Sequence, residues 1–298
     1  MKMIDAPYIS IVIPTYNRPE QLVLCLQACA QLDYPGDRFE VIVVDDGGAV
    51  PLDDIVTRFQ GMLMLRLLRQ ENTGPAAARN RGASEARGEY LAFTDDDCAP
   101  APNWLRALST QMVASPDCAV GGQTRNALTH NLYSTASQLL ISYLLSYYNA
   151  IPHAARFFPS SNLAFPTKQF RAVKGFDVTY LRAAAEDREL CDRWLDQGYR
   201  MIYAAEVVVY HAHALTFRTF LHQHFHYGKG AFCFNQVRAR RRQHRIKVEP
   251  VAFYFNMLRY PFVSAQGARA PLLMLLLVVT QVVNAVGFLW ESTKGTEA

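Results

Sequence analysis

The sequence predicts an α/β fold in which a mostly parallel sheet is flanked by helices. Short β-branched runs alternate with helical patterns along roughly the first hundred residues, an order typical of β-α-β units. The run 39–44 is nearly continuous in apolar residues, as expected for a strand that is covered on both faces. Polar clusters follow the runs 9–13, 39–44 and 90–93, and the carboxyl ends of parallel strands are where such sheets bind ligands.

Hydrophobic periodicity and its interruptions define the individual elements. Tyr34, Pro35 and Gly36 interrupt the first helical pattern, and Gly198 is a typical C-terminal cap for the last helix before the final strand. The pattern predicts strands at 9–13, 39–44, 62–68, 90–93, 120–124, 158–165 and 207–210, and helices at 20–32, 53–60, 76–86, 135–148 and 186–197.

Composition limits the class of protein. A chain of 298 residues, half of them hydrophobic, is long enough to bury a full core and is not a disordered chain. The net charge of +4 is too small to indicate a nucleic-acid partner. The six cysteines have neither metal nor disulfide spacing, and no apolar segment precedes the first strand. We therefore expect no signal peptide and a globular part that stays in the cytoplasm.

The composition changes after about residue 215, so we expect a sheet domain at 1–215 and a helical region at 216–298. Five arginines fall within 238–245, and the segment 272–290 carries no charge. That segment is at the lower limit for spanning a bilayer, about 17–25 residues. Gln281 and Asn284 favour a helix that lies in the membrane plane or self-associates, while the arginines would attract anionic headgroups. The alternative is a buried helix packed on the domain, with solvated arginines.

Three adjacent aspartates, Asp95, Asp96 and Asp97, follow the strand 90–93. An Asp-x-Asp sequence at the carboxyl end of a buried strand offers oxygen ligands to Mg²⁺ or Mn²⁺, which would in turn hold a phosphate-bearing substrate. A solvated acidic turn is the commoner setting of an isolated run of this kind. The motifs described in the next paragraph favour the metal-binding interpretation over the solvated acidic turn.

These motifs together resemble those of glycosyltransferase family 2, whose members have the GT-A fold. They are Ile-Val-Ile-Pro-Thr-Tyr-Asn-Arg-Pro at 11–19, Val-Val-Asp-Asp-Gly-Gly at 43–48, the segments 78–82 and 88–90, the triple Asp, and Glu-Asp at 186–187 leading to 198–200. The resemblance covers about 8–215. It implies one domain, with a nucleotide-sugar half at about 1–120 and an acceptor half at about 121–215. It also implies an inverting, metal-dependent enzyme that uses a nucleotide-sugar donor, UDP-linked by preference.

Donor binding is assigned to residues in the first three motifs and at the triple Asp. Pro14, which closes the first strand, is assigned to nucleotide-sugar binding together with Tyr16 and Asp46. Tyr16 can stack on the base, and Asp46 can accept a hydrogen bond from the base or the ribose. Arg79 would neutralise the diphosphate. The alternatives are a turn-forming role for Asp46 and an exposed helical position for Arg79.

Metal binding and catalysis are assigned by the resemblance to four positions. Asp95 and Asp97 match the DxD signature: Asp95 would contact the ribose or a metal-bound water, and Asp97 would coordinate the cation. Asp96 stays a candidate for donor binding because the triple Asp leaves the register open. His211, after the last strand, is a further metal-ligand candidate or a structural histidine. Asp187 is the general base of a single displacement; the alternative is that acids in a first helical turn favour the helix dipole.

The acceptor is expected to be a glycan or a lipid-linked molecule at the cytoplasmic face of the membrane, in cell-surface glycan or glycolipid synthesis. The Gln-x-x-Arg-Trp motif of processive polysaccharide synthases is absent, which favours transfer of a single sugar. His222 and His226 share a helix face that could bind zinc, form part of a lid or remain an ordinary polar face. A non-catalytic membrane scaffold that binds nucleotide sugars and, less favoured, a nucleotidyltransferase remain alternatives.

Overall fold

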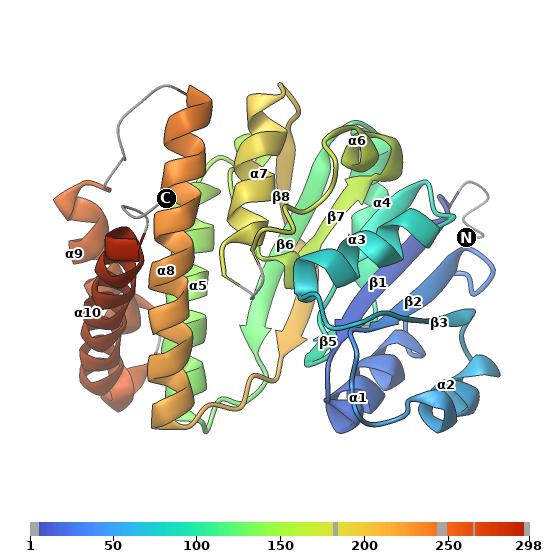
Figure 1. The fold of residues 1–298 in the computed structure, drawn as a ribbon, viewed down its shortest axis with the longest axis horizontal. Helices are drawn as coiled ribbons and strands as arrows, with labels where there is room; N and C mark the ends of the chain where they lie inside the picture. The colour runs from blue at the N-terminus through green and yellow to red at the C-terminus, as the bar shows by residue number, and fades with distance from the viewer. Residues whose placement is uncertain (1–5, 181–183, 243–248, 265, 295–298) are drawn as a thin grey trace.

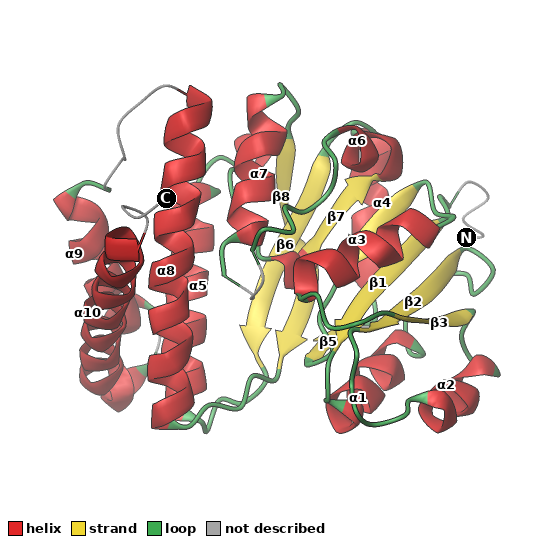
Figure 2. Cartoon of the chain, viewed as in Figure 1, coloured by secondary structure: helices red, strands yellow, loops and turns green. Residues whose placement is uncertain are grey.

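The structure is a computed structural model that describes residues 6–180, 184–242, 249–264 and 266–294. Within these ranges eight strands form one sheet, in the order β3-β2-β1-β4-β7-β6-β8-β5 (Figures 1 and 2). The strands are β1 (Ile9–Thr15), β2 (Phe39–Asp45), β3 (Leu65–Arg69), β4 (Tyr90–Phe93), β5 (Cys98–Pro100), β6 (Ala119–Asn126), β7 (Leu163–Pro166) and β8 (Met201–His211).

The predicted α/β class is confirmed, but the sheet is mixed. The strands β1 to β4 are parallel to one another, and β6 is parallel to β8. The strand β7 runs antiparallel between β4 and β6, and β5 pairs antiparallel with β8. The two halves of the sheet are thus joined through a strand of reversed direction.

Helices cover both faces of the sheet, as Figure 1 shows. Alternate residues of β1 enter different cores, because successive side chains of a strand point to opposite faces: Ile11 and Ile13 into one, Val12 into the other. The first core includes side chains from α1 (Pro19–Cys29), α2 (Asp53–Gln60) and α4 (Trp104–Ala114), and the second from α3 (Pro75–Glu85), α6 (Thr167–Ala172) and α7 (Glu186–Asp196). The sequence patterns did not predict β5, α4 or α6.

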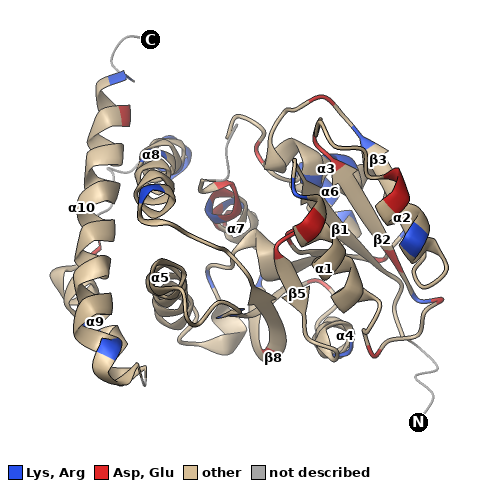
Figure 3. Ribbon diagram, turned by 90° about the horizontal axis from the view of Figure 1, so that it is seen from below, with Lys and Arg blue, Asp and Glu red and all other residues tan. Residues whose placement is uncertain are grey.

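Four long helices form a further layer at one end of the sheet (Figure 3). They are α5 (Leu132–Tyr148), α8 (Phe217–Arg242), α9 (Val251–Val263) and α10 (Ala270–Lys294), accompanied elsewhere by the short 3₁₀ helices η1 (Pro152–Ala154), η2 (Ser160–Asn162) and η3 (Gly267–Arg269). Their contacts are mostly apolar, with Phe220 and Leu273 in one cluster and Met257 and Leu277 in another.

The helix α10 packs through one face and exposes the other. Within the described residues, Gly267–Lys294 is the one helix long and apolar enough to cross a membrane, with a mean hydropathy of 2.3 and 28% of its apolar window buried. The face toward α8 is buried, whereas the opposite face carries exposed apolar side chains. These exposed side chains are Leu272, Leu275, Val278, Val282, Val286, Leu289 and Trp290.

Three arginines of the basic run are paired with carboxylates, whereas Arg240 is exposed and Arg245 lies outside the described residues. Arg241 of α8 contacts Glu189 and Asp192 of α7, and Arg238 and Arg242 contact the same Asp192. The carboxylates were too far away in sequence to be recognised as partners of the run. Those three arginines therefore form ion pairs that hold α8 against α7, and they are not free to bind lipid headgroups.

A tight crossing of α8 and α10 gives the first prediction. A Cβ on Gly228 would lie 2.0 Å from the carbonyl oxygen of Asn284. We expect Gly228→Ala to lower the free energy of unfolding by about 1–3 kcal/mol, because backbone cannot move aside as a flexible side chain can. Chemical denaturation measures the change. The control is Gly61→Ala, where nothing lies within 4 Å of the added Cβ; equal losses in the two variants would contradict the predicted crossing.

Candidate active site

The carboxyl ends of β1 and β4 meet at one edge of the sheet, where they bring the triple Asp to the first motif. Thr15 Oγ1 donates a 2.8 Å hydrogen bond to Asp96 Oδ2. Arg18 Nη1 lies 3.2 Å from Asp96 Oδ1 and 3.1 Å from Asp97 Oδ2, so one guanidinium bridges two neighbouring carboxylates. Because Arg18 itself is half exposed, this cationic bridge faces the open side of the site.

Asp97 also contacts the end of β8. His211 Nε2 lies 3.2 Å from Asp97 Oδ1, and ligand atoms of Asp97, Cys98 and His211 fall within 4.8 Å of one another. This contact depends on β5, which pairs Cys98 directly with His211. A carboxylate and an imidazole that converge in this way fit a divalent cation such as Mn²⁺. Burial and then the charge of Asp97 raise the pKa of the Cys98 thiol, which makes it the weakest candidate ligand of the three.

The aspartates of this cluster differ in their protonation. Burial, opposed by the charge of Arg18, raises the pKa of Asp96 to about 6. Burial also acts to raise the pKa of Asp97, but the hydrogen bond and charge of His211, together with Arg18, outweigh it and lower that pKa. Asp97 is thus ionised at any physiological pH, as a cation ligand must be.

Asp95 is connected to a distant helix through a buried arginine. Arg79 Nη2 lies 2.7 Å from Asp95 Oδ1, and Arg79 Nη1 lies 3.1 Å from Glu186 Oε1. Arg79 and Glu186 are both 3% exposed. The exposed position considered for Arg79 is therefore wrong, and its predicted contact with a diphosphate stays a prediction. In the structure Arg79 joins the third motif, the triple Asp and the start of α7.

Asp187 follows Glu186 in the first turn of α7. Ala185, just before the helix, has a left-handed backbone with φ 75°, and the Arg188 amide donates a 2.7 Å hydrogen bond to Asp187 Oδ1. Burial, followed by the negative charge of Glu186, raises the pKa of Asp187 to about 7, although the amides of Arg188 and Ser160 act in the opposite direction. A carboxyl with this pKa can accept a proton near neutral pH.

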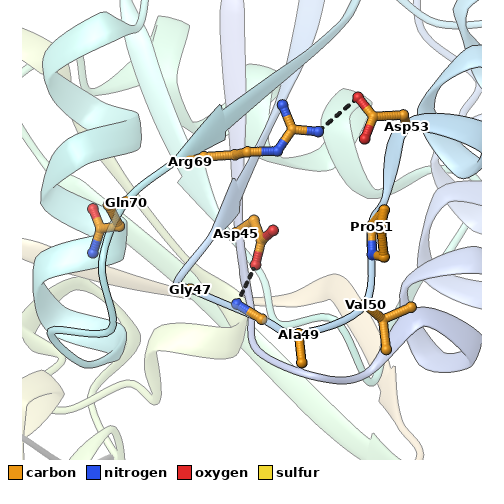
Figure 4. Close-up of a pocket in the computed structure, with 9 residues that line it drawn as sticks. Asp45, Gly47, Ala49, Val50, Pro51, Asp53, Arg69 and Gln70 are labelled. Atoms are coloured by element: carbon orange, nitrogen blue, oxygen red, sulfur yellow. Dashed lines mark hydrogen bonds and ion pairs between the residues drawn. The ribbon is translucent and has the colours of Figure 1, made fainter.

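A cavity of about 450 Å³ lies beside the end of β2 (Figure 4). The turn after the strand forms one wall, where the Gly48 amide donates a 2.9 Å hydrogen bond to Asp45 Oδ1. Arg69, at the end of β3, lies across the cavity and contacts Asp53 at 2.7 Å. The lining residues are Asp45, Gly47, Gly48, Ala49, Val50, Pro51, Asp53, Arg69 and Gln70.

Asp46 secures the loop that leads into α3. Its Oδ1 accepts from Gln70 Nε2 at 2.7 Å and from the Thr73 amide at 3.0 Å, and its Oδ2 accepts from the Gly74 amide at 2.9 Å. The turn-forming alternative is close to what the structure describes. The predicted contact between Asp46 and a base stays a prediction, and it is Asp45 that lines the cavity.

The first motif supplies the rim between the cavity and the acidic cluster. Asn17 Oδ1 accepts a 2.7 Å hydrogen bond from the Ala49 amide of the cavity wall. Tyr16 is 48% exposed at this rim, whereas Pro14 is buried in β1 opposite Val44. Tyr16 is thus free to contact a ligand, while Pro14 can act only through the backbone that it fixes.

Sequence reasoning missed Arg18 and Asp45 as site residues. Both lie inside quoted motifs, but nothing in the sequence places Arg18 opposite two aspartates some eighty positions away, at 3.1 and 3.2 Å. On α8, His222 Nε2 and His226 Nε2 lie 3.2 Å apart. No third ligand groups with them among the described residues, so the zinc alternative gains no support.

The chain is similar to known proteins over most of its length. The sequence profile described as glycosyl transferase family 2 matches residues 10–173. Glycosyltransferase AglE of Haloferax volcanii is 29% identical over 234 residues, which cover 75% of this chain and 73% of that protein. Pre-mycofactocin glycosyltransferase of Mycobacterium tuberculosis is 29% identical over 236 residues, which cover 75% of this chain and only 46% of that protein.

Among solved structures, mannosyltransferase PcManGT from Pyrobaculum calidifontis, in complex with GDP-Man and Mn²⁺, is similar with a TM-score of 0.69. The alignment covers 97% of this chain and 88% of that one, at 21% sequence identity. This likeness extends through the C-terminal helices and shows a shared fold.

The buried arginine gives the second prediction. Arg79→Met removes the partner of Asp95 and Glu186 but keeps an apolar stem, so we expect a loss of about 3–5 kcal/mol in the free energy of unfolding. Arg81→Met on the same helix is the matched control: Arg81 is 51% exposed and lies 3.7 Å from Glu85. Its expected loss is about 0–1 kcal/mol. Urea denaturation of both variants measures the difference, and a loss in Arg79→Met no larger than the control's would refute the bridge.

Proposed function

Because this chain belongs to glycosyltransferase family 2, we propose that it transfers a sugar from a nucleotide-sugar donor to a hydroxyl acceptor in one inverting displacement. The observation that carries the proposal is the meeting of Asp97, Arg18 and His211 at one sheet edge, with Arg79 connecting that edge to the start of α7. A carboxylate cluster for a cation and a separate carboxyl of raised pKa are the two groups that such a displacement needs.

The cavity after β2 is proposed to hold the nucleoside. Asp45 and Gln70 offer hydrogen-bond acceptors and donors there, and Tyr16 offers an exposed ring for stacking at the adjacent rim. In this proposal Asp46 shapes the loop that closes the cavity and contacts the base at its edge. A UDP-linked donor is preferred; the GDP-Man in the complex of the Pyrobaculum enzyme makes a GDP-linked donor the competing outcome.

Asp97, His211 and Asp95 are proposed to hold Mn²⁺ or Mg²⁺. Arg18 lies where a cation would satisfy the two carboxylates Asp96 and Asp97, so the site already favours positive charge. When bound, the cation would stabilise the charge on the departing nucleoside diphosphate. Arg79 is proposed to act beside it, by holding Asp95 in place and adding positive charge toward the phosphates.

Asp187 is proposed to remove the proton from the acceptor hydroxyl. Its raised pKa makes the carboxylate basic enough to take that proton near pH 7. Because the attack and the departure occur in one step, no second nucleophilic carboxylate is required. Glu186, which is buried against Arg79, positions the turn that carries Asp187.

The acceptor side is proposed to lie at the cytoplasmic face of a membrane. The exposed apolar face of α10 is the kind of surface that enters a lipid interface, and Phe255 and Phe262 of the neighbouring α9 are exposed as well. A lipid-linked glycan or a glycolipid would then meet the site in the plane of the membrane. Cell-surface glycan synthesis is the process that this combination suits.

Donor turnover gives the third prediction. Purified protein is mixed with a panel of nucleotide sugars and Mn²⁺ or Mg²⁺, and the released nucleoside diphosphate is quantified. We expect one donor to be turned over and chelation to stop the release. Asp97→Asn should lower kcat/KM roughly 100-fold or more, because a metal contributes several kcal/mol to stabilising transition-state charge.

The control for Asp97→Asn is Asp37→Asn, an exposed aspartate in the turn before β2, which should leave turnover unchanged. Metal-dependent binding of a donor without turnover, even with membrane lipids added, would favour the scaffold alternative. Well-folded protein that binds no donor would refute the transferase proposal.

The pH dependence of turnover gives the fourth prediction. The pKa of Asp187 is raised to about 7, so its basic form is lost as the pH falls through that value. We expect kcat/KM to be constant above about pH 8 and to fall nearly tenfold per pH unit below about pH 6. Asp187→Asn should lower the plateau roughly 10²–10⁴-fold and remove this acid limb. A limb that persists in the variant would assign the titration to another group, such as Asp96.

A further inference from the structure

The helix α8 lies between α7 and α10 (Figures 1 and 3). Its contacts with α7 advance along both helices together. The Arg188 guanidinium carbon lies 4.9 Å from the centroid of the Phe234 ring, and further along Arg242 Nε lies 3.3 Å from Asp196 Oδ1. The two helices therefore run in the same direction. Because α8 begins earlier relative to these contacts, its first turns extend beyond the start of α7, toward the candidate active site.

The backbone of α8 touches the turn that leads into α7 at Gly230. A Cβ at this position would overlap the carbonyl of Ala184. The Ala184 amide donates a 2.8 Å hydrogen bond to Glu186 Oε2, so the segment that faces Gly230 is also linked to the first turn of α7. Gly230 thus gives the level of α8 at which the turn carrying Asp187 lies.

Tyr227 is placed one turn of α8 closer to the active site than Gly230. Residues three and seven positions apart share one face of a helix, so Tyr227 lies on the face that carries Gly230 and Phe234. Three residues advance a helix by about 4.5 Å. Tyr227, which is partly exposed, therefore lies just beyond the first turn of α7, beside the turn that carries Asp187.

A glutamine of the same helix holds the Tyr227 hydroxyl. Gln223 Nε2 donates a 2.7 Å hydrogen bond to it, and the same nitrogen lies 3.3 Å from Ser137 Oγ of α5. The hydroxyl is thus an acceptor toward Gln223, and the described part of the chain supplies no acceptor for its hydrogen. Since hydroxyls in such surroundings are nearly always used as donors as well, this hydrogen is available to a ligand.

The surroundings also keep the Tyr227 hydroxyl protonated. Burial raises the pKa of Tyr227, and the hydrogen bond from Gln223 opposes that effect. The negative charges of Asp187, Glu186 and Asp95 raise this pKa further. The phenol is therefore a hydrogen-bond donor at any physiological pH, and it lies near carboxyls from both the α7 side and the sheet side of the candidate active site.

We propose that the Tyr227 hydroxyl donates a hydrogen bond to the attacking oxygen and aligns it between Asp187 and the sugar donor. In the transfer step the acceptor O–H bond breaks and its proton passes to Asp187. The oxygen bonds to the anomeric carbon, and the bond from that carbon to the phosphate oxygen breaks with its electron pair. A hydroxyl oxygen has two lone pairs: one forms the new bond, and Tyr227 binds the other without exchanging a proton. Gln223 is a positioning residue that acts through Tyr227. This inference rests on the proposed function.

The release of nucleoside diphosphate tests this role, with water as the attacking molecule where no acceptor is added. We expect Tyr227→Phe to lower kcat about tenfold, as for the loss of one hydrogen bond in the transition state, and to leave the donor KM unchanged. The acid limb near pH 7 should persist, because it belongs to Asp187. The melting temperature should stay that of the parent chain, whereas a purely structural hydroxyl would lower it when removed.

Two further variants separate a positioning role from a loss of packing. Tyr133→Phe on α5 is the matched control: the Tyr133 ring lies 5.7 Å from the Phe220 ring of α8, and this variant should turn over like the parent chain. Gln223→Met keeps the length of the side chain but removes the amide, and it should lower kcat several-fold. The double variant Tyr227→Phe/Gln223→Met should be no slower than Tyr227→Phe alone, because Gln223 acts only through the hydroxyl.

Full kcat in folded Tyr227→Phe, or equal losses in Tyr227→Phe and Tyr133→Phe, would overturn the proposal. Additive losses in the double variant would do the same, and so would a raised donor KM with unchanged kcat, which would place the hydroxyl on the donor. Disappearance of the acid limb in Tyr227→Phe would contradict a phenol that exchanges no proton. Parent turnover that Tyr227→Phe retains in full contradicts this inference alone, whereas a parent chain that turns over no donor contradicts the proposed function on which it rests.

Discussion

The structure depends on one buried guanidinium. Arg79 lies between Asp95 at the end of β4 and Glu186 at the start of α7, and its side chain is 3% exposed. A buried charge is tolerated only while its partners stay in place, so this pairing fixes the position of α7 against the sheet edge. The proposed base, Asp187, and the proposed cation ligands Asp95 and Asp97 are about ninety positions apart in the sequence. They form one site because the same arginine restrains both.

The carboxyls of the site differ in acidity because their immediate neighbours differ. Burial acts to raise the pKa of both Asp97 and Asp187, but His211 and Arg18 overcome it at Asp97, whereas Glu186 adds to it at Asp187. One group therefore remains an anion and the other becomes a base near neutral pH. Carboxyls whose environments move their pKa values apart are typical of sites that divide binding and proton transfer between them. Here Asp97 lies beside His211 and Arg18, which favour its anion, whereas Asp187 lies beside Glu186, which disfavours its anion.

The parts of the fold that could be predicted are those with a local signal. Strands such as β2 and helices such as α2 follow from runs and periodicities, and the polar residues after the strands converge because parallel strands end at one edge. The short β5 has three residues and no periodicity of its own, yet it brings Cys98 opposite His211. Arg79, read as a surface residue or a phosphate ligand, is buried by contacts that no local pattern encodes. The basic run illustrates the same point, since its partners on α7 are set by tertiary packing alone.

The C-terminal helices place the exposed apolar face of α10 at a fixed position relative to the sheet edge that carries the candidate active site. The helix α10 is held against α8 where Gly228 and Gly287 allow the two backbones to approach, so its buried face and its exposed face are both fixed. Its first residues follow η3, whose Arg269 lines a second cavity next to β6, and β6 lies beside the strand that carries His211. The exposed apolar face of α10 therefore has a fixed orientation relative to that sheet edge. Rotation of α10 about its axis would turn its exposed apolar face away from the sheet edge. The close crossing with α8 at Gly228 and Gly287 therefore fixes the orientation of this face as well as the packing of the two helices.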